Sequence, residues 1–303
     1  MSVNPMKTTK DLLTGELQDL REEIALVSPK DTPLVSMIYS MGKVVPATDI
    51  TVSWREKELN GTRATALMEG AEAGSPLKST RKMYNNYCQI FEKVVSVSGT
   101  VGALKPHGVG NEYAQELTDR LIELKRDMEY YFFNGTKQAE GVSNGRQMNG
   151  LCNLVSASNV IDKSSSALTL ADIEDGMQKM WEHGANGDVY LFVNAQEKRA
   201  INKFCQANDI TVTTEMLDGV VGVKVDTIET DFGTVHVVLD RHITSGTVIG
   251  VDMNYVEVGE LRSVFHETLA KTGDYEKGHV LAELTIKLTN QYAGFKIVNI
   301  TAE

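Results

Sequence analysis

The sequence is short of cysteine and of basic residues, and it has no long hydrophobic run. Its three cysteines, Cys88, Cys152 and Cys205, are odd in number and far apart, so we expect no disulfide framework. No uncharged apolar stretch reaches the roughly 18 residues from which a membrane-spanning helix is inferred. The charged N-terminal residues also lack the continuous apolar core of a signal peptide. These shortages predict a protein of reduced, intracellular surroundings.

The balance of charge excludes another class of protein. Thirty lysines and arginines stand against 41 aspartates and glutamates, which gives a formal net charge of −11. Because neutralising phosphates requires a net basic surface, this balance argues against strong non-specific binding to nucleic acid. Residues 1–137 carry 17 basic and 18 acidic side chains, whereas residues 138–303 carry 13 and 23. We therefore expect the two halves of the chain to face different surroundings.

Motifs that carry catalytic chemistry are missing. The sequence contains no phosphate-binding P-loop, no Gly-x-Ser-x-Gly nucleophile and no His-Glu-x-x-His metal motif. Gly108 and Gly110 resemble the start of a dinucleotide-binding loop, but Tyr113 stands where the third glycine belongs. The six histidines are scattered, and neither His236 nor His266 has cysteine or acidic neighbours at metal-ligand spacing. We expect neither enzymatic activity nor a metal ion or other cofactor.

Two stretches predict amphipathic helices. One covers residues 12–26 in an N-terminal arm, and its polar face is acidic. The other covers residues 111–134, with Asn111 as N-cap and a left-handed ending at Gly135, and would form a spine of roughly 35 Å. The apolar stripes comprise Leu17, Leu20, Ile24 and Leu26 in the first helix, and Tyr113, Leu117, Leu121, Leu124, Met128 and Phe132 in the second.

A long β-hairpin is predicted between these helices. Alternating side chains predict one strand up to about residue 57 and a second over about residues 87–98, with the Gly-rich residues 58–80 as the tip. A lone hairpin is marginally stable, so it must lie on another surface. Residues 46–100 carry seven basic and six acidic side chains, and both docking on an acidic neighbour and a solvated face explain this charge. The length and the apolar alternation favour docking. The candidate contact residues are Arg55, Lys57, Arg63, Glu69, Glu72, Lys78, Arg81 and Lys82.

The second half of the chain predicts an α/β lobe followed by strands alone. Thr169 and Asp172 match the capping box of a helix, and a buried strand, a second helix and strands over residues 222–227 and 233–239 follow. From Thr247 onward every regular segment has the pattern of a strand, and no internal repeat is visible.

The order of these elements resembles the major capsid proteins of tailed bacteriophages, which have the Hong Kong 97 capsid fold. The resemblance is sharpened by DTPLVSMIYSMGKV, by the tip MEGAEAGSP, by LTLADIEDGMQKMWEHG with NAQEKRAINKF, and by LAKTGDYEKGHVLAELTIKLTNQYAGFKI near the end. It covers nearly the whole chain and is strongest to an uncleaved branch of the family.

The resemblance implies an α+β shell subunit. Its parts would be an N-terminal arm over residues 1–45, an extended loop over residues 46–98, a peripheral domain over residues 99–146 and 246–303, and an axial domain over residues 147–245. Hundreds of copies would form hexamers and pentamers of one icosahedral shell around double-stranded DNA, without sequence-specific binding. A peripheral-domain loop near the three-fold contacts would supply Lys271, Asp274, Glu276 and Lys277. Such a subunit would belong to the virion and be assembled in the cytoplasm of a host bacterium.

Two departures from the family and two alternatives remain. No scaffolding segment precedes the arm, so we expect scaffolding to be separate or unnecessary, beside portal and decoration proteins. No lysine–asparagine pair with an acidic catalyst matches the isopeptide crosslink of some relatives.

An encapsulin-type nanocompartment shell would share the fold and would differ in enclosing a cargo enzyme. An α/β enzyme is the third hypothesis, and it requires a pocket that joins His242, His266 and an acid.

Overall fold

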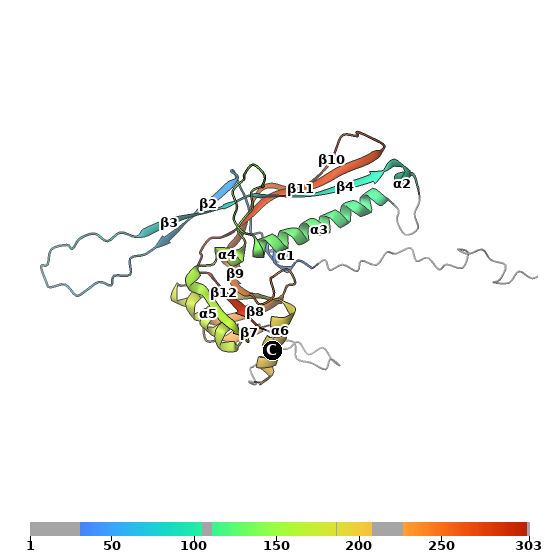
Figure 1. Ribbon diagram of the computed structural model, residues 1–303. Coiled ribbons are helices and arrows are strands. Elements are labelled where there is room, and N and C mark those ends of the chain that lie inside the picture. The colour runs from blue at the N-terminus through green and yellow to red at the C-terminus, as the bar shows by residue number, and fades with distance from the viewer. Residues whose placement is uncertain (1–30, 105–110, 186, 208–226, 302–303) are drawn as a thin grey trace, which may run out of the picture.

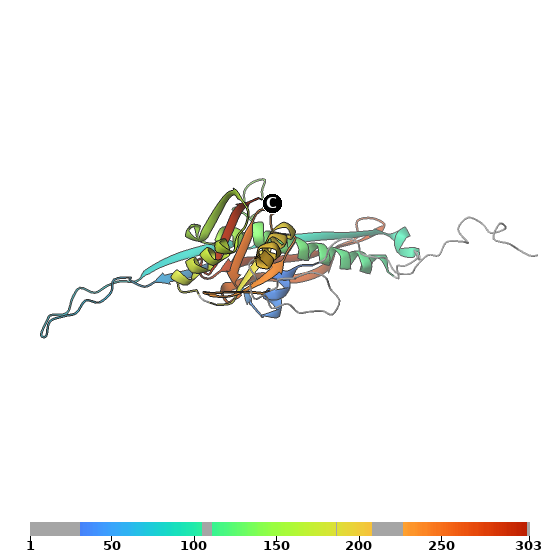
Figure 2. The same cartoon turned by 90° about the horizontal axis from the view of Figure 1, so that it is seen from below.

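The computed structural model describes residues 31–104, 111–185, 187–207 and 227–301 (Figure 1). The predicted arm helix and nearly all of the predicted strand over residues 222–227 lie outside this part of the chain. A two-stranded ribbon projects at one end of the molecule, a four-stranded sheet with a long helix runs to the other end, and a second sheet with two helices lies below them (Figures 1 and 2).

The four-stranded sheet has the order β1-β10-β11-β4. Its strands are β1 (Val44–Pro46), β10 (Val256–Thr268), β11 (Tyr275–Leu288) and β4 (Gln89–Ser98). The pairs β10–β11 and β11–β4 are antiparallel, whereas the short β1 runs parallel to β10. Helix α3 (Glu112–Asn134) packs on β4 and β11, α1 (Pro33–Ser40) packs on α3, and α2 (Gly99–Ala103) follows β4.

Helix α3 is the predicted spine, although two details of the prediction are wrong. Its N-cap is confirmed, because the side chain of Asn111 accepts a hydrogen bond from the Ala114 amide. The buried part of the stripe comprises Leu124, Met128 and Phe132. Leu121 was expected among them but is 40% exposed. Gly135 has φ −52° rather than a left-handed conformation, and a Cβ there would lie 2.7 Å from two backbone oxygens, so close approach requires this glycine.

The six-stranded sheet has the order β5-β12-β9-β6-β8-β7. Its strands are β5 (Val160–Ser166), β12 (Gly294–Ile300), β9 (Val248–Asp252), β6 (Val189–Val193), β8 (Gly233–Leu239) and β7 (Thr227–Thr230). Helices α5 (Leu170–Glu182) and α6 (Ala195–Ala207) pack against it, and the predicted capping box of α5 is confirmed. The prediction that residues 246–303 join the spine helix in one sheet is therefore wrong for β9 and β12, whose hydrogen bonds place them here.

Strand β6 shows how this sheet joins two cores. Val189, Leu191 and Val193 belong to the core under α5 and α6. Phe192 points to the other face and contacts Phe133 of α3, with ring centroids 5.1 Å apart. Successive side chains of a strand point to opposite faces, so a continuous apolar strand is required where both faces are covered. The lobe is thereby fixed to the spine helix.

The projecting ribbon consists of β2 (Thr51–Glu58) and β3 (Thr80–Tyr87), paired antiparallel from Thr51 opposite Tyr87 to Glu58 opposite Thr80. The predicted first strand is confirmed. The predicted second strand is wrong in its partner, because residues 89–98 form β4 and pair with β11. The prediction placed no strand over residues 81–86, because residues 80–87 are mostly polar and lack the alternation that marks a strand with one buried face.

Candidate intersubunit interface

The outer part of the hairpin has no partner in its own chain. Every residue from Lys57 to Met83 is exposed. Leu67 and Met68 at the tip are 74% and 86% exposed, and Leu59 and Leu77 are also largely open to solvent. The ribbon projects away from both sheets (Figures 1 and 2). A segment of this length without a core gains little stability from burial within its own chain, so it is a candidate for contacts outside the subunit.

The base of the hairpin, in contrast, is held firmly to the body. The side chain of Asn86 is fully buried and donates to the carbonyl oxygens of Asn149 (2.9 Å) and Ile286 (2.7 Å). Its Oδ1 accepts the Asn149 amide at 2.7 Å. One side chain thus joins β3, the segment before α4 (Leu151–Leu154) and β11. Because buried polar groups are costly to leave unpaired, these bonds fix where the hairpin leaves the body.

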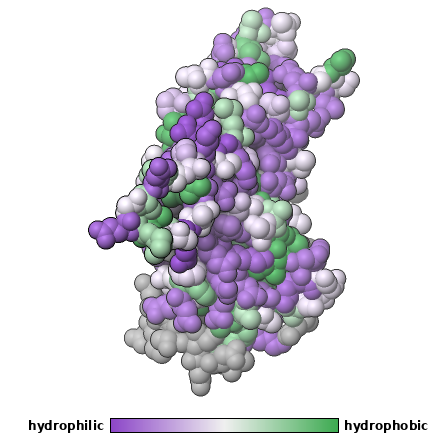
Figure 3. Space-filling view, turned by 90° about the vertical axis from the view of Figure 1, so that its left-hand side faces the viewer, coloured by the Kyte–Doolittle hydropathy of each residue, from purple (hydrophilic) through white to green (hydrophobic). Residues whose placement is uncertain are grey.

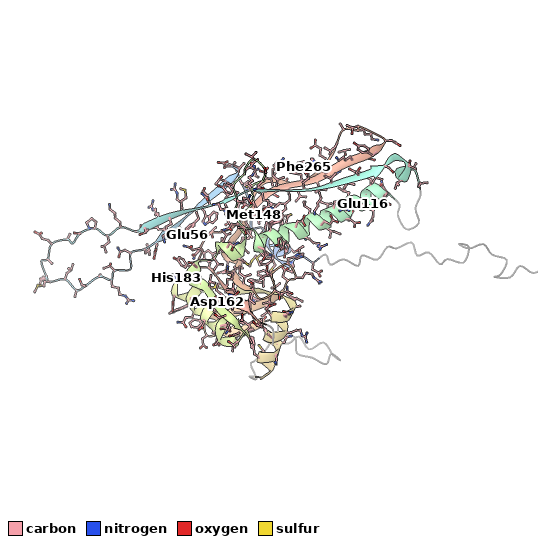
Figure 4. The ribbon with its side chains drawn as sticks, viewed as in Figure 1. Glu56, Glu116, Met148, Asp162, His183 and Phe265 are labelled. Carbon is pink, nitrogen blue, oxygen red and sulfur yellow. The ribbon has the colours of Figure 1, made fainter. Side chains whose placement is uncertain are left out.

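A second set of contacts fixes the direction of the ribbon. The backbone amide of Gln291 donates a hydrogen bond to Glu56 Oε1 (2.8 Å), and its side-chain amide donates one to the Tyr84 hydroxyl (2.7 Å). The ring of Trp54 stacks on that of Tyr84. Burial raises the pKa of Glu56, while its bonds with Gln291 act in the opposite direction. Figure 4 shows Glu56 at the hairpin base above His183 of the lobe, and a groove of about 440 Å³ separates them.

An ion cluster around the buried Glu283 connects the hairpin base to the four-stranded sheet. Arg146 donates its Nε to the Cys88 carbonyl (2.7 Å) and pairs with Glu283 on β11. Glu283 also accepts from Arg262 Nε at 2.7 Å, and its side chain is 5% exposed. Removing the arginine partners would leave the buried charge of Glu283 uncompensated. These contacts join the linker before α4, the residue after β3 and the two long strands β10 and β11.

The hairpin cations face one another and lack partners. Lys57 lies directly opposite Arg81 in the register, and like charges in this position destabilise a strand pair. Glu56 opposite Lys82 is the one cross-strand pair of opposite charge on this part of the ribbon. With the residues that the structure describes, no ion pair is formed by Arg55, Lys57, Arg63, Lys78, Arg81 or Lys82, and none by Glu69 or Glu72. This surface suits a partner that carries anionic groups.

The second predicted contact group lies at the opposite end of the molecule (Figure 1). Lys271, Asp274, Glu276 and Lys277 surround the turn between β10 and β11. The Asp274 carbonyl accepts the Gly99 amide at 3.0 Å, so the turn is braced by α2. The four side chains form no ion pair with any described residue. The structure does not bring the two predicted groups together, and one neighbour could not meet both in the same place.

The histidines required by the enzyme hypothesis are far apart. His266 on β10 lies 2.9 Å from the hydroxyl of Tyr113 in the first turn of α3, whereas the His242 carbonyl accepts from Asn134 at the last residue of α3. These contacts are 21 residues apart on one helix, or roughly 30 Å at 1.5 Å per residue. No shared pocket can join them. Among the described residues, no group of three potential ligands could hold a metal ion, and no helix is long and apolar enough to cross a membrane.

The residues that anchor the hairpin were missed by sequence reasoning. Asn86, Arg146, Glu283 and Gln291 are scattered over some 200 positions, and polar residues of these types read as solvent-exposed by default. One signal was present for Glu283, which stands in an otherwise apolar run on β11.

Viewed from the hairpin side, the surface is mostly hydrophilic, with small separate hydrophobic groups (Figure 3).

Comparisons with known proteins give this geometry a context. The model of the SU10 major capsid protein family matches residues 6–301. The major capsid protein of Escherichia phage Phieco32 is 31% identical over 118 residues, which are 39% of this chain and 32% of that protein's length, so the match spans about a third of the relative.

Two of the solved structures with a similar fold show how far the likeness extends. The capsid asymmetric unit of cyanophage A-1(L) has a TM-score of 0.69 at 12% identity, covering 97% of this chain and 98% of that one. The SrpI encapsulin of Synechococcus elongatus PCC 7942 has a TM-score of 0.59 at 10% identity, covering 91% and 93%. At these identities the likeness concerns the fold alone. The long hairpin, the spine helix and the two sheets are the Hong Kong 97 capsid fold, and the family match over almost the whole sequence shows that the chain belongs to the SU10 major capsid protein family.

Proposed function

We propose that this chain builds the icosahedral shell of a tailed bacteriophage, with the hairpin reaching over a neighbouring copy. The observation that carries the proposal is the contrast between a hairpin base held by buried hydrogen bonds and an outer part that is wholly exposed. A structural protein needs no catalytic site, and the separated histidines support a role without enzymatic activity.

The two contact groups act on different neighbours in this proposal. The hairpin charges, from Arg55 to Lys82, bind the adjacent subunit of the same hexamer or pentamer. The charges of the turn, from Lys271 to Lys277, bind subunits around the three-fold axis. Their position at opposite ends of the molecule supports this division, because a closed shell needs contacts in more than one direction.

The subunit has four working parts in this assignment: an arm before α1, the projecting hairpin, a peripheral part built on the four-stranded sheet and α3, and an axial part built on the six-stranded sheet. We assign β9 and β12 to the axial part, and their pairing within the six-stranded sheet supports this assignment. The net charge of −10 in residues 138–303 suits a shell lining that confines double-stranded DNA without holding it. Separate scaffolding and portal proteins would assist assembly in the bacterial cytoplasm, before the chain becomes part of the virion.

A nanocompartment shell is the second candidate, because the encapsulin has a similar fold. The two functions differ in what the particle contains. Nuclease treatment of purified particles, followed by extraction, would recover protected double-stranded DNA from a phage capsid and a cargo enzyme from a nanocompartment.

The proposal is tested by shortening the hairpin. Residues 59–79 are replaced by Asn-Gly, which closes Glu58 and Thr80 with a two-residue turn. The anchors at the base remain, so the unassembled subunit should keep its melting temperature while particle yield in sedimentation falls. Normal particle yield, or an unfolded subunit, would contradict an intermolecular role.

A paired substitution tests the apolar contacts without removing the loop. The double variant Leu67→Ser with Met68→Ser should lower particle yield, because a loss of about 1–2 kcal/mol per interface accumulates over many copies. Val142→Ser is the control, since Val142 is fully exposed in a loop outside the hairpin. Equal yields from the two variants would show that the tip makes no apolar contact in the shell.

A further inference from the structure

An apolar groove lies between α1, α3 and β10. Its volume is about 360 Å³. The lining residues are Val35, Ser36, Tyr39, Leu121, Leu124, Lys125, Met128 and Val264. Tyr39, Leu121 and Val264 come from three different elements, and each is 40% exposed. Apolar side chains that are exposed together, rather than singly, mark a surface that another segment covers.

The start of the described chain lies beside this groove. Asp31 pairs with Arg241 at 3.0 Å, and α1, which begins at Pro33, forms one wall of the groove. Residues 12–26 end five positions before Asp31, and an extended chain of that length spans at most about 18 Å. Since α1 has eight residues and is therefore about 12 Å long, these residues can reach the groove of their own subunit.

The sequence of residues 12–26 complements the groove in its apolar pattern and in its charge. Leu17, Leu20 and Ile24 recur at helical spacing and would present one apolar stripe. The stretch carries Glu16, Asp19, Glu22 and Glu23 against the single cation Arg21, so it is acidic overall. On the rim of the groove, Lys125 donates to the Ser36 hydroxyl at 3.1 Å and forms no ion pair with a described residue, so it is available to an acidic segment.

We propose that residues 12–26 of the same chain bind in this groove and bury Leu17, Leu20 and Ile24 against Leu121, Tyr39 and Val264. The contact explains why the apolar stripe of the spine helix continues to Leu121, where the described chain provides no cover. The contact would also hold residues 12–26 on their own subunit, so that only residues 1–11 extend beyond the groove.

Disulfide trapping in the full-length chain tests this assignment. The three native cysteines are buried, so cysteines introduced by Leu20→Cys and Leu121→Cys form the reactive pair. We expect this pair to crosslink within one chain about ten-fold faster than the matched pair of Glu22→Cys and Leu121→Cys, because Glu22 lies on the opposite face of the stretch and a docked thiol has a high effective concentration. Circular dichroism of the reduced variants checks that they fold.

The remaining outcomes overturn the proposal. Crosslinks between two chains would show that the groove receives the arm of a second copy, and equal rates for the two pairs would show that the arm does not dock there. Hydrogen exchange provides a second measurement. Removing residues 1–27 should speed amide exchange over residues 34–40 and 117–128, and an unchanged rate in both segments contradicts the proposal even if the cysteine variants fold poorly.

Discussion

Replacing Glu129 by glutamine should change how the stability of the subunit depends on pH. Glu129 lies on α3, is fully buried, and accepts the amides of Leu34 and Val35 at 2.7 Å each. These are the first free donors of α1, since Pro33 has none. Burial, followed by a hydrogen bond and repulsion from Asp240, raises the pKa of Glu129 to about 9. The carboxyl group therefore keeps its proton in the folded protein at neutral pH.

The sign of the effect follows from the two pKa values. In the unfolded chain Glu129 has its ordinary pKa of about 4.5, so between that value and about 9 the folded state holds a proton that the unfolded state has released. The bound proton of Glu129 makes its full contribution to stability below the ordinary pKa. This contribution declines as the pH rises towards the raised pKa of the folded protein. Within this window, each rise of one pH unit lowers the free energy of unfolding by about 1.4 kcal/mol. A rise of about three units therefore lowers it by roughly 4 kcal/mol.

Glu129→Gln removes this proton and keeps the shape of the side chain. Its amide can donate to Asp240 and its oxygen can accept one backbone amide, so one donor of α1 is left unpaired at a cost of about 1–3 kcal/mol. We expect the variant to be less stable than the native chain near about pH 5.5. Between this pH and about pH 8.5, the difference in free energy of unfolding should change by roughly 4 kcal/mol in favour of the variant.

Urea unfolding of the unassembled subunit across this pH range, at constant ionic strength, measures the difference. Asp175→Asn is the control, because Asp175 is exposed on α5 and its loss should leave the pH dependence close to that of the native chain. Parallel stability curves for the native chain and Glu129→Gln would refute the reasoning.

Two further substitutions test the packing. Leu124→Asp places a charge at a position that is 1% exposed and should cost about 3 kcal/mol or more in urea unfolding of the subunit. Val142→Asp, at a fully exposed position, should cost much less, and equal losses would show that burial does not decide the cost. Gly250→Ala brings a Cβ within 2.4 Å of the buried Phe295 ring and should cost about 1–3 kcal/mol by thermal unfolding, while Gly141→Ala, with open space around it, should be silent.

The sequence by itself determined the local elements of this protein. The N-cap at Asn111 and the capping box from Thr169 to Asp172 depend on side chains within three positions of the backbone they satisfy, so the pattern is sufficient to place them. The apolar period of 3.6 likewise predicted α3. The absence of catalytic motifs and the order of the elements pointed to a capsid subunit, and the family match agrees with that assignment.

Only the tertiary structure decided which segments are partners. An apolar alternation shows that one face of a strand is covered, but it does not identify the covering element, so β4 was joined to the hairpin although it pairs with β11. The same reason accounts for β9 and β12, which are close in sequence to β10 and β11 but pair within the other sheet. The stripe of α3 likewise did not show that its neighbours leave Leu121 open. Long-range partners follow from the competition of all segments for burial, which no local pattern contains.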